Sequence, residues 1–123
     1  MQSFLHSRLR SISFAVQGWK HTLRTQRNTW IHTTISALVI LLGLWLHLPA
    51  RDWAVILLTM ALVWAAEFFN TALEVLTDLV HPETHPLAKT IKDVSAAAVL
   101  VTAAAALLIG ILILGPPLWE RFF

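Results

Sequence analysis

Three carboxylates and an amide follow a long apolar run and share one side of a predicted helix. The run from Trp53 to Ala66 is almost uninterrupted, and Glu67, Asn70, Glu74 and Asp78 come directly after it. Offsets of three, seven and eleven residues from Glu67 place all four side chains on one stripe, at 100° per residue. Carboxylates of this kind hold a divalent cation or accept a proton. The stripe is therefore the first candidate for chemistry.

The helix that carries this stripe belongs to a chain built for a membrane. The sequence is 57% hydrophobic and 13% charged, and its mean hydropathy is +0.68. A span needs about 20 apolar residues, and three segments reach that length: residues 30–48, 53–80 and 93–114. These features predict an all-α membrane protein with three transmembrane helices. At 123 residues, we expect one integral-membrane domain, residues 1–123.

The first 29 residues are basic and lack a long apolar core, which argues against a secretory leader. We predict that residues 4–29 form an amphipathic helix on an anionic membrane surface, so that the bilayer itself is a partner. The positive-inside rule then places the N-terminus in the cytoplasm and, after three crossings, the C-terminus outside. No nucleic-acid-binding module accompanies the basic residues. The basic residues of this N-terminal segment are Arg8, Arg10, Lys20, Arg24 and Arg27.

This topology brings three polar clusters to the cytoplasmic ends of separate helices: residues 26–32, 67–78 and 89–93. An ionisable residue inside a span costs roughly 3 kcal/mol or more, so each is a functional candidate. Phosphoryl transfer with Mg²⁺, a proton or cation path, and purely structural pairing all fit these residue types. The sequence has no cysteine, no phosphate-binding glycine loop and no HExxH-like histidine spacing. Spacing alone leaves the three options open.

Several of these residues also have ordinary structural explanations. Thr90-Ile-Lys-Asp93 fits a capping box, so Asp93 has a possible role at a helix start. Lys92 fits an interfacial anchor, and Asn70 fits a hydrogen bond between helices. Residues 26–32 fit a row of anchors at the membrane interface.

A longer pattern extends the acidic stripe in both directions. It comprises Glu67-x-x-Asn70-Thr-Ala-Leu-Glu74-x-x-x-Asp78, then His85, Ala88 and Lys92-Asp-Val-Ser-Ala-Ala-Ala-Val99, with Arg10-Ser11, Phe14-Ala15, Gly18, Arg24-Thr-Gln-Arg-Asn28 and Ile31-His32 before it. Over nearly its full length, the chain resembles the small prokaryotic diacylglycerol kinase and undecaprenol kinase family. The basic arm and the Ala-rich third span favour the undecaprenol kinase branch.

The resemblance implies a homotrimer with composite active sites, in which ATP and Mg²⁺ bind at the cytoplasmic face of the bacterial inner membrane. A membrane lipid alcohol, undecaprenol or diacylglycerol, would receive the phosphate. By the same resemblance, Glu67 is the base that takes the hydroxyl proton, Asn70 supports it, and Glu74 is a metal ligand beside the phosphates. The implied nucleotide contacts are Phe14, Glu74, Glu83, Thr84, His85, Lys92 and Asp93. Ala96 and Arg10 are implied in substrate binding or support.

One departure from the family pattern concerns the metal. The family usually carries a second metal-binding Glu before the first span, where this chain has Gln26, and no acid precedes Asp52. A neutral amide oxygen binds Mg²⁺ more weakly than a carboxylate does. We therefore expect a raised Mg²⁺ requirement or a weakened enzyme. The alternative is a catalytically weakened relative that acts as a membrane scaffold or a small proton-conducting bundle.

Overall fold

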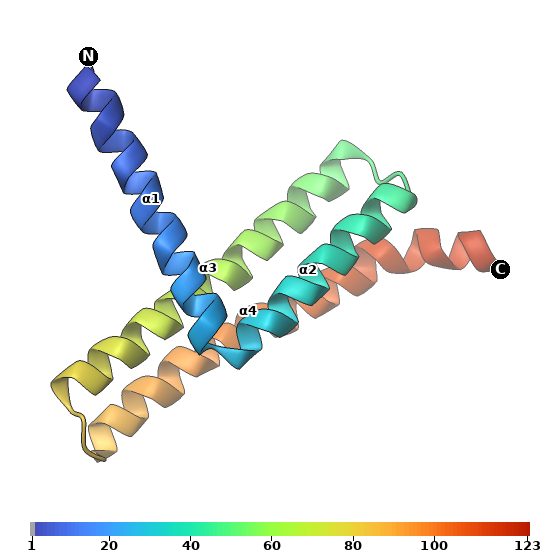
Figure 1. Ribbon diagram of the computed structural model, residues 1–123. Helices are drawn as coiled ribbons and strands as arrows, with labels where there is room; N and C mark the ends of the chain where they lie inside the picture. The colour runs from blue at the N-terminus through green and yellow to red at the C-terminus, as the bar shows by residue number, and fades with distance from the viewer. Residues whose placement is uncertain (1) are drawn as a thin grey trace.

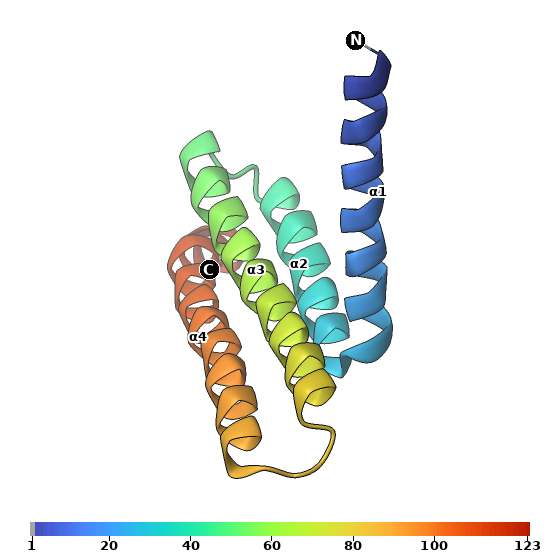
Figure 2. The same cartoon turned by 90° about the vertical axis from the view of Figure 1, so that its left-hand side faces the viewer.

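The computed structural model describes residues 2–123, with side chains from residue 4 onward except that of residue 5. It is all-helical over that range, with four helices: α1 (Gln2–Thr25), α2 (Arg27–Trp45), α3 (Ala50–Val80) and α4 (Pro86–Phe122). Helices α2, α3 and α4 form a bundle, and α3 and α4 make the most extensive contact (Figure 1). The α3–α4 hairpin extends past the start of α2 in both ribbon views (Figures 1 and 2).

The turn between α2 and α3 is tight because two local features favour it. The Leu48 N–H donates to the Gly43 carbonyl oxygen at 3.1 Å, and His47 takes a left-handed φ of 55°. Pro49 then precedes α3 with an extended backbone. The helix thus begins at Ala50, three residues before the predicted start of the second span at residue 53. Asp52 lies in the first helical turn, where a carboxylate suits the helix dipole.

Helix α4 is longer than the predicted span 93–114 at both ends. It begins at Pro86, because a proline at the first position loses no hydrogen bond, and the His85 side chain accepts from the Leu87 N–H. The Thr90 hydroxyl donates to the Pro86 carbonyl oxygen, so the predicted capping box does not form. At the other end the helix continues through Pro116 and Pro117. Its last turns bend away from the bundle axis (Figure 1), as prolines within a helix cause.

Helix α1 ends at Thr25, and α2 begins at Arg27, earlier than the predicted start of the span at residue 30. Gln26 alone separates them, with an extended backbone. The N-terminal half of α1 stands clear of the bundle in both views (Figures 1 and 2). Its other half packs on α3 through Trp19, whose ring lies 5.1 Å from that of Trp64 and 5.4 Å from that of Phe68, centroid to centroid.

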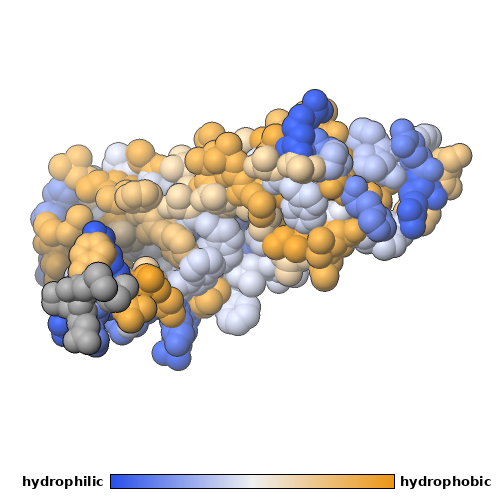
Figure 3. Space-filling model, turned by 90° about the horizontal axis from the view of Figure 1, so that it is seen from above, coloured by the Kyte–Doolittle hydropathy of each residue, from blue (hydrophilic) through white to orange (hydrophobic). Residues whose placement is uncertain are grey.

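Three of the helices, α2, α3 and α4, are long and apolar enough to cross a membrane. Large hydrophobic side chains on all three face outward; Leu41 is 64% exposed and Leu100 is 71% exposed. Figure 3 shows orange hydrophobic side chains over much of the elongated body, with blue hydrophilic side chains in separate groups. A surface of this kind suits hydrocarbon rather than water.

The buried interior contains many polar side chains. A small apolar core of Leu48, Ile56 and Leu114 closes the end near the α2–α3 turn. The other end buries a set of polar residues: Thr22, Thr29, Glu67, Asn70, Thr71, Thr77 and Ser95. In lipid, packing of small and polar residues between helices takes the place of a hydrophobic core.

Candidate active site

A cavity of about 300 Å³ lies between α2, α3 and α4 and contains the predicted base, Glu67, with four other predicted site residues. We call it the acidic cavity. Its lining includes Gln26, His32, Glu67, Asn70, Glu74 and Ala96. The 3.6-residue period of α3 explains why Glu67, Asn70 and Glu74 share this cavity, as the sequence predicts. Helix α4 presents mainly small and apolar side chains to it, which leaves room beside the acids.

Glu67 is the deepest acid of the cavity and is 1% exposed. Its Oε1 accepts from the Thr29 hydroxyl at 3.3 Å, and Thr29 is fully buried. Its Oε2 has no hydrogen-bond partner among the residues that the structure describes. The His32 Nε2 atom lies 3.8 Å from that oxygen. A buried carboxylate oxygen without a hydrogen-bond donor is poorly stabilised. A reactant that donates a hydrogen bond to this oxygen would satisfy it.

Glu74 sits in a chain of hydrogen bonds that links three elements. The Gln26 Nε2 atom donates to Glu74 Oε2 at 2.5 Å, and Asn70 Nδ2 donates to Oε1 at 3.3 Å. The Ser95 hydroxyl, from α4, donates to the Asn70 Oδ1 atom at 2.8 Å. The Gln26 amide must present nitrogen to a carboxylate, because a carboxylate only accepts. Both oxygens of Glu74 are therefore held in place by amides.

A second cavity, of about 580 Å³, lies in the α3–α4 hairpin and contains five of the seven predicted nucleotide contacts. We call it the hairpin cavity. Glu83, Thr84, His85, Lys92 and Asp93 all line it. It begins at Asp78, one helical turn beyond Glu74 on α3, so the two cavities adjoin.

Two ion pairs lie along the wall of the hairpin cavity. The Lys92 Nζ atom donates to Asp78 Oδ1 at 2.5 Å, and Lys89 pairs with Asp93. All four side chains are partly or largely exposed. Exposed pairs contribute little, about 0–1 kcal/mol, so an incoming phosphate can take Lys92 from Asp78 at small cost.

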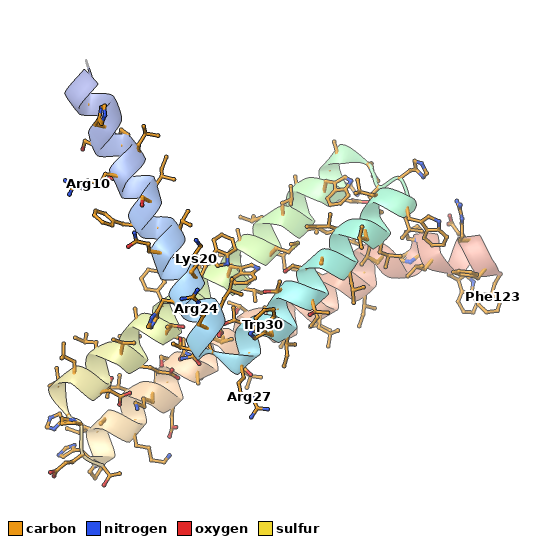
Figure 4. All side chains as sticks on the ribbon, viewed as in Figure 1. Arg10, Lys20, Arg24, Arg27, Trp30 and Phe123 are labelled. Atoms are coloured by element: carbon orange, nitrogen blue, oxygen red, sulfur yellow. The ribbon has the colours of Figure 1, made fainter. Side chains whose placement is uncertain are left out.

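Two predicted ligand contacts lie outside both cavities. Phe14 is 60% exposed on α1 and lines neither. Arg10 points away from the bundle on the projecting part of α1, whereas Arg24 and Arg27 lie where α1 joins α2 (Figure 4). Within one chain, therefore, Arg10 and Phe14 do not meet Glu67.

Sequence reasoning missed three residues that contact the predicted site residues of the acidic cavity. Thr29 and His32 contact Glu67, and Ser95 contacts Asn70. A signal existed in the spacing of Gln26, Thr29 and His32, since steps of three residues place them on one side of a helix. The interpretation of residues 26–32 as interfacial anchors hides that signal.

The donor set suits Mg²⁺ only as an ion shared with phosphates. In the part of the chain that the structure describes, no three His, Asp or Glu side chains cluster as a metal site. Mg²⁺ commonly binds through one or two carboxylates together with substrate phosphates and waters. Glu74 provides one carboxylate, and Gln26 provides an amide that would have to turn its oxygen toward the ion. The residues thus fit a phosphate-bound Mg²⁺.

An apolar groove of about 560 Å³ adjoins the acidic cavity along α2, α3 and α4. Ile31, His32 and Ala103 line both spaces. The rest of the groove is almost wholly hydrophobic, with Ile35, Val63 and Leu107 among its lining. A hydrocarbon chain in this groove would bring its polar end to His32 and Glu67.

Together, the helices and cavities define a membrane protein in which a buried acid, Glu67, lies in the acidic cavity and an apolar groove adjoins that cavity. The family model described as prokaryotic diacylglycerol kinase matches residues 13–114. The chain is 45% identical over 109 residues to a diacylglycerol kinase of Synechocystis sp., covering 88% of this chain and 62% of the relative's length. It is 37% identical over 109 residues to an undecaprenol kinase of Bacillus subtilis, covering 89% of each protein.

The chain therefore belongs to the prokaryotic diacylglycerol kinase family. This confirms the family that the sequence motifs indicate. Both relatives are named as kinases of lipid alcohols, that is, as phosphotransferases with an alcohol group as acceptor.

Proposed function

We propose that this protein transfers the γ-phosphate of ATP to the hydroxyl group of a membrane lipid at the cytoplasmic face of the bacterial inner membrane. The observation that carries the proposal is the position of Glu67. It is buried in the acidic cavity beside His32, which also lines the apolar groove, and one of its oxygens is unused. Membership of the prokaryotic diacylglycerol kinase family supports the same chemistry.

The hairpin cavity would hold the nucleotide. It lies beyond the start of α2, on the side where Arg24 and Arg27 mark the predicted cytoplasmic surface (Figures 2 and 4). Lys92 would leave Asp78 to bind phosphate, with Asp93, Glu83, Thr84 and His85 around the remainder of the ligand. The phosphates would extend along α3 toward Glu74, one helical turn away.

The lipid would enter from the side through the apolar groove. Its hydroxyl would donate its proton to Glu67 Oε2 as the hydroxyl oxygen attacks the γ-phosphorus. The bond between the γ-phosphorus and the β–γ bridging oxygen would break, and that oxygen would leave as part of ADP. Asn70 and Gln26 would hold Glu74 in place beside the phosphates. When bound there, Mg²⁺ would neutralise charge on the phosphate oxygens.

A homotrimer with shared sites is part of this proposal. Arg10 and Phe14 are remote from Glu67 within one chain, so a neighbouring subunit would have to bring them to a site. Helix α4 exposes four small side chains, Ala97, Ala98, Ala104 and Ala105. Small residues let membrane helices approach closely.

An exposed, basic α1 supports the proposed surface helix. Its hydrophobic side chains Leu9, Ile12 and Val16 are all open to their surroundings, and a bilayer surface would cover them. Arg10, Lys20 and Arg24 would then meet anionic headgroups.

An assay of the purified chain tests the function. In detergent with ATP and Mg²⁺, we expect labelled phosphate to reach undecaprenol or diacylglycerol, with undecaprenol preferred. Glu67→Gln keeps the shape of the side chain but cannot accept the proton, so it should lower kcat by about 100-fold or more. Gln17→Glu, on exposed α1, should leave kcat unchanged.

Activity that survives in Glu67→Gln would refute the assigned base. The second candidate, a non-catalytic relative, rests on Gln26, which supplies an amide where a carboxylate would bind metal more strongly. Failure to phosphorylate any lipid alcohol, at any Mg²⁺ concentration, would favour it.

A further inference from the structure

Glu67 contacts two side chains of α2, and the function proposed above uses neither of them. Thr29 holds Oε1 with a hydroxyl, and His32 faces Oε2 at 3.8 Å. Both come from the same turn of α2, three residues apart, so one helix face covers both oxygens of the acid. The arrangement resembles that of a general base held by supporting donors.

His32 is well placed for this task by burial as well as by distance. Its side chain is 13% exposed, against 2% for that of Glu67. It lines both the acidic cavity and the apolar groove, so it stands at their junction. The remaining gap of 3.8 Å is too long for a hydrogen bond. A small rotation of the imidazole, or one bridging water, closes it.

Resting on the proposed lipid kinase activity, we propose that His32 is the positioning residue of Glu67. Its Nε2 N–H bonds to Oε2 and fixes the carboxylate so that the second lone pair of that oxygen faces the lipid hydroxyl. A carboxylate oxygen has room for both contacts, because each accepts more than one hydrogen bond. Nε2 must carry the hydrogen for this role, since the partner is a carboxylate oxygen.

The other side chains of the acidic cavity favour His32 for this role. The titratable groups that line the acidic cavity are His32 from α2 and Glu67 and Glu74 from α3. Helix α4 contributes Ala96, Val99, Leu100 and Ala103, none of which donates a side-chain hydrogen bond. Gln26 and Asn70 direct their amides to Glu74. The third amide of the lining, Asn28, is exposed and makes no hydrogen bond to Glu67 Oε2. His32 is therefore the side chain best placed to donate to Oε2.

Kinetics of the full-length chain in detergent test the role. We expect His32→Leu to lower kcat about tenfold or more, because hydrogen bonds to charged groups contribute strongly and a base misplaced by an ångström loses rate. The KM values for ATP and lipid should stay within about twofold. His32→Gln, which keeps a donor, should recover most of the rate. His21→Leu, the same change on exposed α1, should have no effect.

A kcat within twofold of the wild type in His32→Leu would overturn the role. So would a loss confined to the KM of the lipid, which would make His32 a substrate contact, or a loss that His32→Gln does not relieve.

A double-mutant cycle separates this inference from the proposed function, because it needs no activity. Thermal unfolding is measured for His32→Leu, Glu67→Gln and the double variant. If the two side chains interact, their effects are non-additive, and additive shifts would overturn the contact. A wild type that phosphorylates no lipid alcohol would refute the proposed function while the cycle still decides the pairing.

Discussion

At the scale of single residues, Gln26 combines a backbone position at the N-cap of α2 with a side-chain contact to Glu74. It is the one non-helical residue between α1 and α2, at the N-cap of α2, where Ser, Thr, Asp or Asn would normally cap the helix. Its side chain makes no cap bond and donates to Glu74 instead. The amide thus fixes the orientation of Glu74 at the expense of local helix stability.

Gln26→Glu tests whether this amide limits metal binding. A second carboxylate beside Glu74 should lower the Mg²⁺ concentration for half-maximal activity by about tenfold, because carboxylates bind the ion more strongly than amides. Mg²⁺ titrations of phosphate transfer by both proteins give the measurement. Gln17→Glu on exposed α1 adds the same charge and should leave the titration unchanged. An unaltered Mg²⁺ midpoint and rate in Gln26→Glu would rule the idea out.

Helical spacing was enough to predict that Glu67, Asn70 and Glu74 share a site, because all three lie on one helix. The partners of these residues come from other helices, and a contact between helices depends on packing that spacing does not encode. The contacts of Thr29 and His32 with Glu67 could not be predicted from spacing for this reason. The amide direction of Gln26 was also out of reach, because it is set by Glu74, 48 residues later.

At the scale of elements, Gly43 determines how closely α2 and α3 pack near their shared turn. A Cβ added there would lie 2.9 Å from two atoms of the Trp53 ring and 3.1 Å from the Leu48 side chain. An indole ring held between two helices moves little, so the contact cannot relax easily. The close approach therefore requires glycine.

Gly43→Ala should destabilise the protein by about 1–3 kcal/mol through overpacking. Gly110→Ala is the matched control, since nothing lies within 4 Å of a Cβ at that position of α4. That change should leave stability equal or slightly higher, because alanine favours the helix. Thermal unfolding in detergent compares the two variants. Equal melting temperatures for both would contradict the tight contact at Gly43.

The number of helices that span was predictable from composition, whereas their ends were not. Apolar length alone identifies α2, α3 and α4. The start of α4 at Pro86 and its continuation through Pro116 depend on whether proline falls at a first turn or in an interior, and both outcomes are compatible with the sequence. The predicted span stops at residue 114, whereas the helix continues through Pro116 and Pro117.

At the scale of the whole molecule, one chain leaves two requirements unmet. Arg10 and Phe14 do not reach the acidic cavity, and α4 exposes the small side chains of Ala97, Ala98, Ala104 and Ala105. If Arg10 and Phe14 serve a site, a neighbouring subunit must bring them to it. The small side chains of α4 provide a surface on which a neighbouring subunit can pack. A proposed trimer satisfies both.

Ala104→Leu tests that assembly, because a larger side chain among the small residues of α4 would keep two packed helices apart. Light scattering in detergent should give the wild type a protein mass about three times the 13.8 kDa of one chain. Ala104→Leu should lower that mass and lower activity with it, since a shared site is lost on dissociation. Ala37→Leu, at an exposed position of α2 among Leu and Ile, should change neither. A wild type with the mass of a single chain and full activity would show that each subunit completes its own site.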